Sequence, residues 1–186
     1  MSTTVPVVSQ TLKNLLAAFE GERNASVRYT AFALRAEEEG YLRVGTLFRA
    51  AARAEQIHAA SHAQIINKLG GTPECKIHEP IVGTTAENLA AAKKGEEYER
   101  DVMYPGFITE AEAAHQPAAL RTFRNAMEAE AVHAKLYGDA LANLEAQRAA
   151  ATFYVCTYCG NVMEDPAQDR CNICHAPKEK FEVFRS

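Results

Sequence analysis

The amino-acid sequence predicts a mainly helical protein, a four-helix bundle followed by a small cysteine-bearing domain. The bundle is predicted by four long stretches in which apolar residues recur at helical spacing, each with glutamate in the middle of its apolar face. After Thr152 this spacing stops, aromatic residues become frequent, and four of the five cysteines lie in two Cys-x-x-Cys pairs. We therefore expect a helical domain over residues 1–148 and a metal-binding domain over 153–186.

Composition excludes several classes of function. With 20 basic and 24 acidic residues the formal net charge is -4, and no strongly basic stripe is present, so nucleic acid is not expected as a partner. No apolar run approaches the roughly 18 residues of a membrane span, and the start of the chain lacks a signal-sequence pattern. We expect a cytoplasmic protein with no membrane partner. In a reducing compartment, paired cysteines indicate metal ligation rather than disulfides.

The first predicted helix runs from about Leu12 to Glu39, after a loosely ordered arm through Thr11. Gly40 follows as a C-terminal cap. Alternate steps of four and three along this stretch place Glu22 in the middle of the apolar face, with Tyr29 two turns further on.

The second predicted helix, over about 44–69, carries the most polar face. Glu55, His58 and His62 lie in the middle of a face that is apolar at both ends, where isolated charge would be expensive to bury. We interpret His62 as a packed or hydrogen-bonding histidine rather than a ligand. Gly40-Tyr41 allows only a tight connection, so the first two helices should be antiparallel neighbours.

The segment after the second helix is rich in glycine, proline and threonine and is predicted to be a loop. Loops this long are uncommon inside compact domains, but about 15 extended residues at ~3.3 Å each can traverse a bundle. One long crossover distinguishes ferritin-like bundles from simple up-and-down bundles. We therefore expect a ferritin-like bundle.

The third predicted helix starts with Thr85 as its N-cap and continues to about His115, with Glu96 and Glu99 on one face. Pro105 should kink or unwind it just beyond these glutamates. The fourth predicted helix has Pro117 in its first turn and ends near Arg148.

The buried faces together hold five carboxylates and at least two imidazoles, with no lysine or arginine to neutralise them, so we expect bound cations. Two Glu-x-x-His pairs and single glutamates on the other two helices are the ligand pattern of di-iron and di-manganese carboxylate proteins. Tyr29 and Tyr104 could hydrogen-bond to these ligands. The candidate ligands are Glu22, Glu55, His58, Glu96, Glu99, Glu130 and His133.

The two cysteine pairs form a strong signal for a four-thiolate site. Each pair can form a turn that directs two thiolates at one tetrahedral ion, and eleven residues separate the pairs. Tetrahedral sulfur coordination fits both structural zinc and redox-active iron. Cys75 lies in the long loop and is interpreted as an incidental free thiol. The ligands are Cys156, Cys159, Cys171 and Cys174.

The order of these motifs over nearly the whole chain resembles the rubrerythrin family. The matching motifs, in chain order, are Gly21-Glu22 with Arg28-Tyr29, the first Glu-x-x-His pair, Glu96-x-x-Glu99 before Met103-Tyr104-Pro105-Gly106-Phe107, the second Glu-x-x-His pair, and the paired cysteines. The resemblance implies a ferritin-like di-iron domain joined to a rubredoxin-like iron domain. It also implies a peroxidase that reduces hydrogen peroxide to water in oxidative stress defence. Electrons would come from NADH through separate reductases or rubredoxin.

The resemblance also implies roles for individual residues. Glu55 and Glu130 would bridge a di-iron oxo-carboxylate centre, Glu96 and His133 would bind one iron, and Glu22 the other. The second iron would exchange Glu99 for His58 on reduction, so these two residues are the catalytic candidates. The four cysteines would hold a single electron-transfer iron.

Two further expectations come from this resemblance. The commonest family pattern has proline after the third cysteine, whereas this chain has Asn172, a change that leaves the ligands intact. The family also assembles head to tail, with the rubredoxin-like iron of one subunit beside the di-iron site of another. We therefore expect a homodimer or larger even assembly.

Two alternatives remain open at the level of sequence. The bundle could act as a ferroxidase or oxidase that uses dioxygen, or it could store iron beside a structural zinc knuckle. The extra carboxylate Glu99 and the appended thiolate centre favour the peroxidase, because iron storage needs neither.

Overall fold

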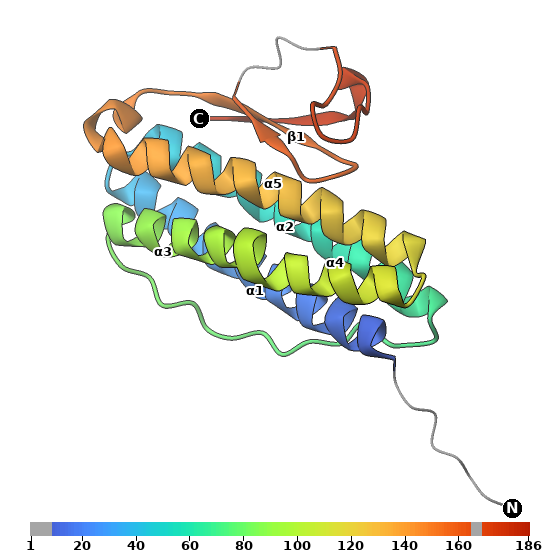
Figure 1. Ribbon diagram of the computed structural model, residues 1–186. Coiled ribbons are helices and arrows are strands. Elements are labelled where there is room, and N and C mark those ends of the chain that lie inside the picture. The colour runs from blue at the N-terminus through green and yellow to red at the C-terminus, as the bar shows by residue number, and fades with distance from the viewer. Residues whose placement is uncertain (1–8, 165–168) are drawn as a thin grey trace, which may run out of the picture.

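The computed structural model describes residues 9–164 and 169–186, and Figure 1 shows a helical bundle with a small sheet against one side. The predicted bundle with a cysteine-bearing appendage is confirmed. Within the described residues, no helix combines the length and hydropathy that membrane crossing requires. The long helices are α1 (Gln10–Glu38), α2 (Leu42–Lys68), α3 (Thr85–Tyr98), α4 (Tyr104–Ala113) and α5 (Pro117–Ala142).

The C-terminal part contains a three-stranded antiparallel sheet in the order β2-β1-β3. Its strands are β1 (Thr152–Cys156), β2 (Val162–Met163) and β3 (Phe181–Arg185), and two 3-10 turns, η2 (Leu144–Arg148) and η3 (Lys178–Lys180), complete this part.

The start of α1 differs from the sequence-based expectation. The Ser9 hydroxyl accepts a hydrogen bond from the Leu12 amide at 3.2 Å and so caps the helix. Thr11 is buried within α1 rather than part of a loose arm, so that prediction was wrong for residues 9–11. The rest of the predicted arm lies outside the described residues. At the other end, Gly40 has a φ of 80°, as a C-terminal glycine cap requires.

The predicted crossover between α2 and α3 is present. It runs along the outside of the bundle past α1 (Figure 1) and contains neither helix nor strand. Asn24 of α1 holds it in place, because its side chain donates to the Lys76 carbonyl at 2.9 Å and accepts from the His78 amide at 2.8 Å. The long crossover, rather than a tight turn, therefore connects α2 to α3.

The third predicted helix is interrupted beside the candidate site. Between α3 and α4 lies one turn of π-helix, η1 (Glu99–Met103), and Pro105 occupies the first turn of α4. Isolated π turns are rare and often lie at functional sites. The fourth predicted helix was too long, because α5 ends at Ala142 and η2 follows.

The sheet shares a core with the bundle. Phe153, Val155 and Val162 are buried in the same apolar cluster as residues of α1 and α2. At the edge of this interface, Arg53 of α2 donates two hydrogen bonds to the Glu182 carboxylate, at 2.7 and 2.8 Å. The small domain is therefore fixed against α2 by apolar burial and by a bidentate ion pair.

The N-cap of α3 is Thr84, one residue before the predicted Thr85. The Thr84 hydroxyl accepts from the Glu87 amide, and the Glu87 carboxylate accepts from the Thr84 amide, forming a capping box. We expect Thr84→Ala to lower the free energy of unfolding by about 1 kcal/mol, measured by urea denaturation. Thr72→Ala, in the exposed crossover, is the matched control and should leave it unchanged. Equal losses in both variants would contradict the capping role.

Candidate metal centres

The bundle brings six of the seven predicted ligands into two groups that share Glu55 and Glu130. In each group the ligand atoms all lie within 4.8 Å of one another. Every member is buried, and because Glu55 and Glu130 belong to both groups they are placed to bridge two ions. The first group is Glu22, Glu55, His58 and Glu130, and the second is Glu55, Glu96, Glu130 and His133.

The orientation of the donor atoms fits metal ions. The Nδ1 atom of His58 lies 2.9 Å from a Glu130 oxygen, and the Nδ1 atom of His133 lies 2.7 Å from the other Glu130 oxygen. Despite these distances, neither Glu130 oxygen nor His133 Nδ1 has a properly directed hydrogen bond to any residue that the structure describes. Buried polar atoms normally have partners. Bound cations would supply partners for these three buried atoms.

Electrostatics also indicates that cations are needed. Burial raises the pKa of Glu22 and Glu96 well above the ordinary value, and the neighbouring carboxylates raise it further. Burial lowers the pKa of His133, but the Glu130 and Glu55 carboxylates outweigh this and raise it to about 10. The same carboxylates raise the pKa of His58 well above its usual value despite burial. Carboxylate-rich sites with imidazoles suit iron or manganese.

The other ring nitrogen of each histidine contacts the cysteine domain. His58 Nε2 lies 2.9 Å from the Cys159 carbonyl oxygen, and His133 Nε2 lies 3.2 Å from the Gly160 carbonyl oxygen. A carbonyl only accepts, so each Nε2 carries a hydrogen, and Nδ1 is the nitrogen that a metal ion would bind in place of a proton. The sequence did not predict this contact within one chain.

Glu99 is the predicted ligand that does not join either group. It begins the π turn, and its side chain is partly exposed. Its charge nevertheless raises the pKa of Glu22, after the larger effect of burial, so it lies close to the first group. The structure thus completes the first group with His58 and holds Glu99 beside it.

Two tyrosines bind the carboxylates, as their positions in the sequence suggested. The Tyr29 hydroxyl donates to Glu96 Oε1 at 2.6 Å, and the Tyr104 hydroxyl donates to Glu22 Oε1. Both tyrosines are buried, so these bonds fix the orientation of the two single glutamates.

His62 extends the Tyr104 contact toward the surface. Its Nε2 lies 3.1 Å from the Tyr104 hydroxyl and its Nδ1 lies 3.2 Å from the Thr122 hydroxyl. Burial, with the nearby His58, lowers the pKa of His62 to about 3, so the ring is neutral. Thr122 borders a cavity of about 660 Å³ between α2, α5 and the cysteine domain. The sequence analysis did not single out Thr122. It lies eight residues before Glu130, two steps of four along the same predicted helix.

The four paired cysteines also converge. The Sγ atoms of Cys156 and Cys174 are 3.5 Å apart, and those of Cys159 and Cys171 are 3.6 Å apart. A tetrahedral site with metal–sulfur bonds of about 2.3 Å needs sulfurs about 3.8 Å apart, so the cluster fits one ion. Cys75 lies away from this cluster, partly buried against the bundle core.

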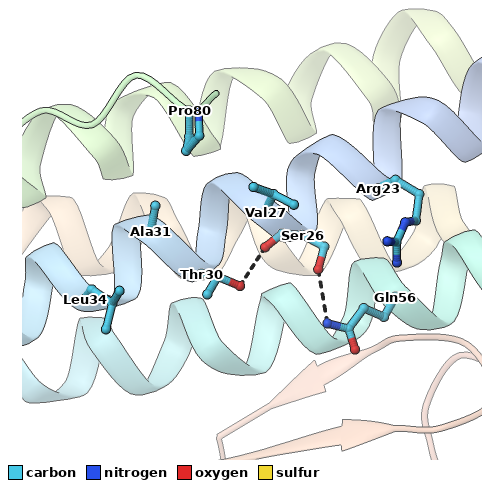
Figure 2. Close-up of a pocket in the computed structure, with 8 residues that line it drawn as sticks. All are labelled: Arg23, Ser26, Val27, Thr30, Ala31, Leu34, Gln56 and Pro80. Carbon is cyan, nitrogen blue, oxygen red and sulfur yellow. Dashed lines mark hydrogen bonds between the residues drawn. The ribbon is translucent and has the colours of Figure 1, made fainter. Parts of the chain in front are cut away.

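A separate pocket of about 330 Å³ lies on the outer side of α1 and α2, beneath Pro80 of the crossover (Figure 2). The Ser26 hydroxyl on its wall donates to the Ala52 carbonyl at 2.9 Å and accepts from the Gln56 amide at 3.2 Å. None of the described residues that line this pocket is a carboxylate or a cysteine. Its polar pair therefore holds α1 against α2 one turn from the candidate ligands.

Comparison with known families identifies both parts of the chain. The family model described as rubrerythrin matches residues 13–141, and the model for the rubrerythrin rubredoxin-like domain matches residues 154–182. Nigerythrin from Nitratidesulfovibrio vulgaris is 35% identical, covering 95% of this chain and 88% of its own length. Rubrerythrin from Porphyromonas gingivalis is 35% identical, covering 96% of this chain and 92% of its own.

Solved structures agree with these matches. The fully reduced, all-ferrous state of nigerythrin superposes with a TM-score of 0.90 at 34% identity, over 99% of this chain and 91% of that one. A bacterioferritin from Desulfovibrio desulfuricans, at 18% identity and a TM-score of 0.69, shares the bundle fold over 75% of this chain and 82% of its own. The chain belongs to the rubrerythrin family, whose di-iron carboxylate site and rubredoxin-like cysteine site are both present here.

Proposed function

We propose that this protein is a peroxidase that reduces hydrogen peroxide to water with electrons relayed through the cysteine site. The observation that carries the proposal is the pair of contacts from Cys159 and Gly160 to His58 and His133. A ligand of the cysteine site is thereby hydrogen-bonded through its own carbonyl to a ligand of the carboxylate site. Iron storage or a structural zinc knuckle would need no such contact.

The ligands of the two irons follow from the groups described above. We assign Glu55 and Glu130 as bridges, Glu22 with His58 to one iron, and Glu96 with His133 to the other. Bound iron would supply the electrons that cleave the O–O bond. The protein keeps this site dry, because all six side chains are buried.

We assign Glu99 to a redox-linked exchange with His58. A hard carboxylate suits the ferric ion, whereas an imidazole tolerates the ferrous ion. Glu99 begins the π turn and is partly exposed, and isolated π turns often lie at functional sites. Its proximity to Glu22 supports this role, because Glu99 and His58 would then both lie near the iron that Glu22 binds.

Conversion of one peroxide to two waters consumes two electrons and two protons. Three hydrogen bonds provide a proton path that runs inward from the cavity bordered by Thr122. The Thr122 hydroxyl donates to His62 Nδ1, His62 Nε2 donates to the Tyr104 hydroxyl, and Tyr104 donates to Glu22. All donors in this arrangement point the same way, so successive proton shifts deliver a proton to the Glu22 carboxylate.

Electrons enter at the cysteine site from a separate donor. Cys156, Cys159 and Cys171 are fully buried, whereas Cys174 is partly exposed and lines the same cavity as the exposed Tyr158. We propose that a donor protein such as rubredoxin, or an NADH-dependent reductase, docks at this exposed edge. The path onward lies within one chain, so it does not depend on the head-to-tail homodimer. The head-to-tail homodimer stays a prediction. Light scattering that detects monomer alone would contradict it.

The exchange role of Glu99 predicts that Glu99→Ala slows peroxide turnover by roughly 10- to 100-fold while the fold and the cysteine site stay intact. The measurement is peroxide consumption at saturating electron donor, together with circular dichroism and metal content. Glu128→Ala, an exposed glutamate on α5, is the matched control and should retain full turnover. Turnover in Glu99→Ala equal to that of the control would contradict the exchange.

The electron path predicts a strong effect of Gly160→Ala. A Cβ atom at residue 160 would lie 2.2 Å from His58 Nε2, and a φ of +74° already disfavours a side chain. The cysteine turn must therefore move away, and we expect reoxidation of the cysteine site by peroxide to slow by about 10- to 100-fold. Stopped-flow absorbance measures this rate.

Gly106→Ala is the control for the preceding variant, since a Cβ atom there meets nothing within 4 Å. It should reoxidise at the wild-type rate. If Gly160→Ala binds both metals and also reoxidises at that rate, electrons do not pass through this contact.

A further inference from the structure

The turn over residues 159–161 faces both metal sites. Its Cys159 and Gly160 carbonyls accept from the two ligand histidines, and the Asn161 carbonyl accepts from the Cys156 amide at 3.0 Å. The Asn161 side chain is completely buried inside the cysteine domain. Buried polar groups normally have hydrogen-bond partners, so the side-chain amide of Asn161 should have one.

The partner of Asn161 is a ligand sulfur. Its Nδ2 atom lies 3.6 Å from Cys171 Sγ and 2.7 Å from Asn172 Oδ1, so both amide hydrogens are used. With the amide reversed, its oxygen would face a thiolate and a second amide oxygen, which is repulsive. The geometry therefore requires the N–H group to point at the sulfur.

This bond adds to the donors that the backbone supplies. The amides of Ile173 and Cys174 also donate to the Cys171 sulfur. Apart from the cysteines themselves, Asn161 is the one side chain in the described part of the protein that hydrogen-bonds to a ligand sulfur. Asn172, the residue that replaces the usual proline, accepts the other amide hydrogen through its Oδ1 atom.

We propose that Asn161 raises the reduction potential of iron at the cysteine site. The inference rests on the proposed function, because it requires iron rather than zinc at these sulfurs. Ferric iron with four thiolates carries a net charge of about -1, and accepting one electron makes it about -2. An N–H dipole directed at a sulfur stabilises the more negative, reduced form more strongly. Hydrogen bonds to sulfur are an established means of setting such potentials.

The cost of this arrangement supports an electronic role. The Oδ1 atom of Asn161 is buried and has no hydrogen-bond partner among the described residues. An apolar side chain in this place would avoid that penalty. A raised potential makes the site easier for a donor to reduce and restricts onward transfer to strong oxidants, of which peroxide is one.

The test is a redox titration of the full-length, iron-loaded protein, followed by its visible thiolate-to-iron band. We expect Asn161→Leu, which has a similar shape, to lower the reduced-to-oxidised ratio at a fixed potential. The expected loss is about 3- to 10-fold, and tenfold corresponds to 59 mV for one electron. The band should also move to longer wavelength, because the sulfur then gives up electron density more easily. Asn161→Ala should behave likewise, and it replaces the leucine variant if that does not fold.

The control is Asn172→Ala, which removes the other partner and leaves the sulfur bond in place. It should stay close to the wild-type potential. An unchanged potential in iron-loaded Asn161→Leu or Asn161→Ala would overturn the inference, as would an equal shift in Asn172→Ala. Zinc in the wild-type cysteine site would overturn the proposed function as well. Metal analysis therefore separates the two failures.

Discussion

The contact of His58 and His133 with the Cys159–Gly160 turn is the interaction on which this structure depends. Each imidazole donates through Nε2 to a carbonyl of the cysteine domain and presents Nδ1 to the carboxylates. One hydrogen bond thus fixes the tautomer of a metal ligand and also joins the two sites. The approach is so close that residue 160 has no room for a side chain. The shared apolar core and the Arg53–Glu182 pair hold the domains together so that this contact persists.

Burial of the carboxylates is the reason that the site needs bound cations. The helices remove carboxylates from water, which is unfavourable unless positive charge is nearby. Bound cations supply that charge, and the tyrosines that donate to Glu22 and Glu96 hold the single carboxylates in place. The π turn begins at Glu99, which belongs to neither ligand group and lies partly exposed beside the first. The structure therefore combines six buried candidate ligands with one further carboxylate held beside them.

The sequence predicts the helices well, because apolar spacing directly reports which face is buried. The ligand groups followed from that spacing, since residues three and four apart share a face. The N-cap was misplaced by one residue because Thr84 and Thr85 have the same chemistry and only the capping box separates them. The interruption of the helix near Pro105 was predicted, but its π-helical geometry and the Asn161–Cys171 bond were not. Both depend on local backbone geometry, and the contact between the domains depends on tertiary packing, which no residue spacing encodes.

The most direct test of the account follows the fully reduced, wild-type protein after addition of hydrogen peroxide, with its metals quantified. Electron transfer from the cysteine site to the carboxylate site predicts about three irons per chain and a thiolate-to-iron band that returns as peroxide is consumed. Zinc in the cysteine site, or iron there that stays reduced while peroxide disappears, would contradict it. The protein would then be a ferritin-like metal protein whose cysteine domain has a structural role.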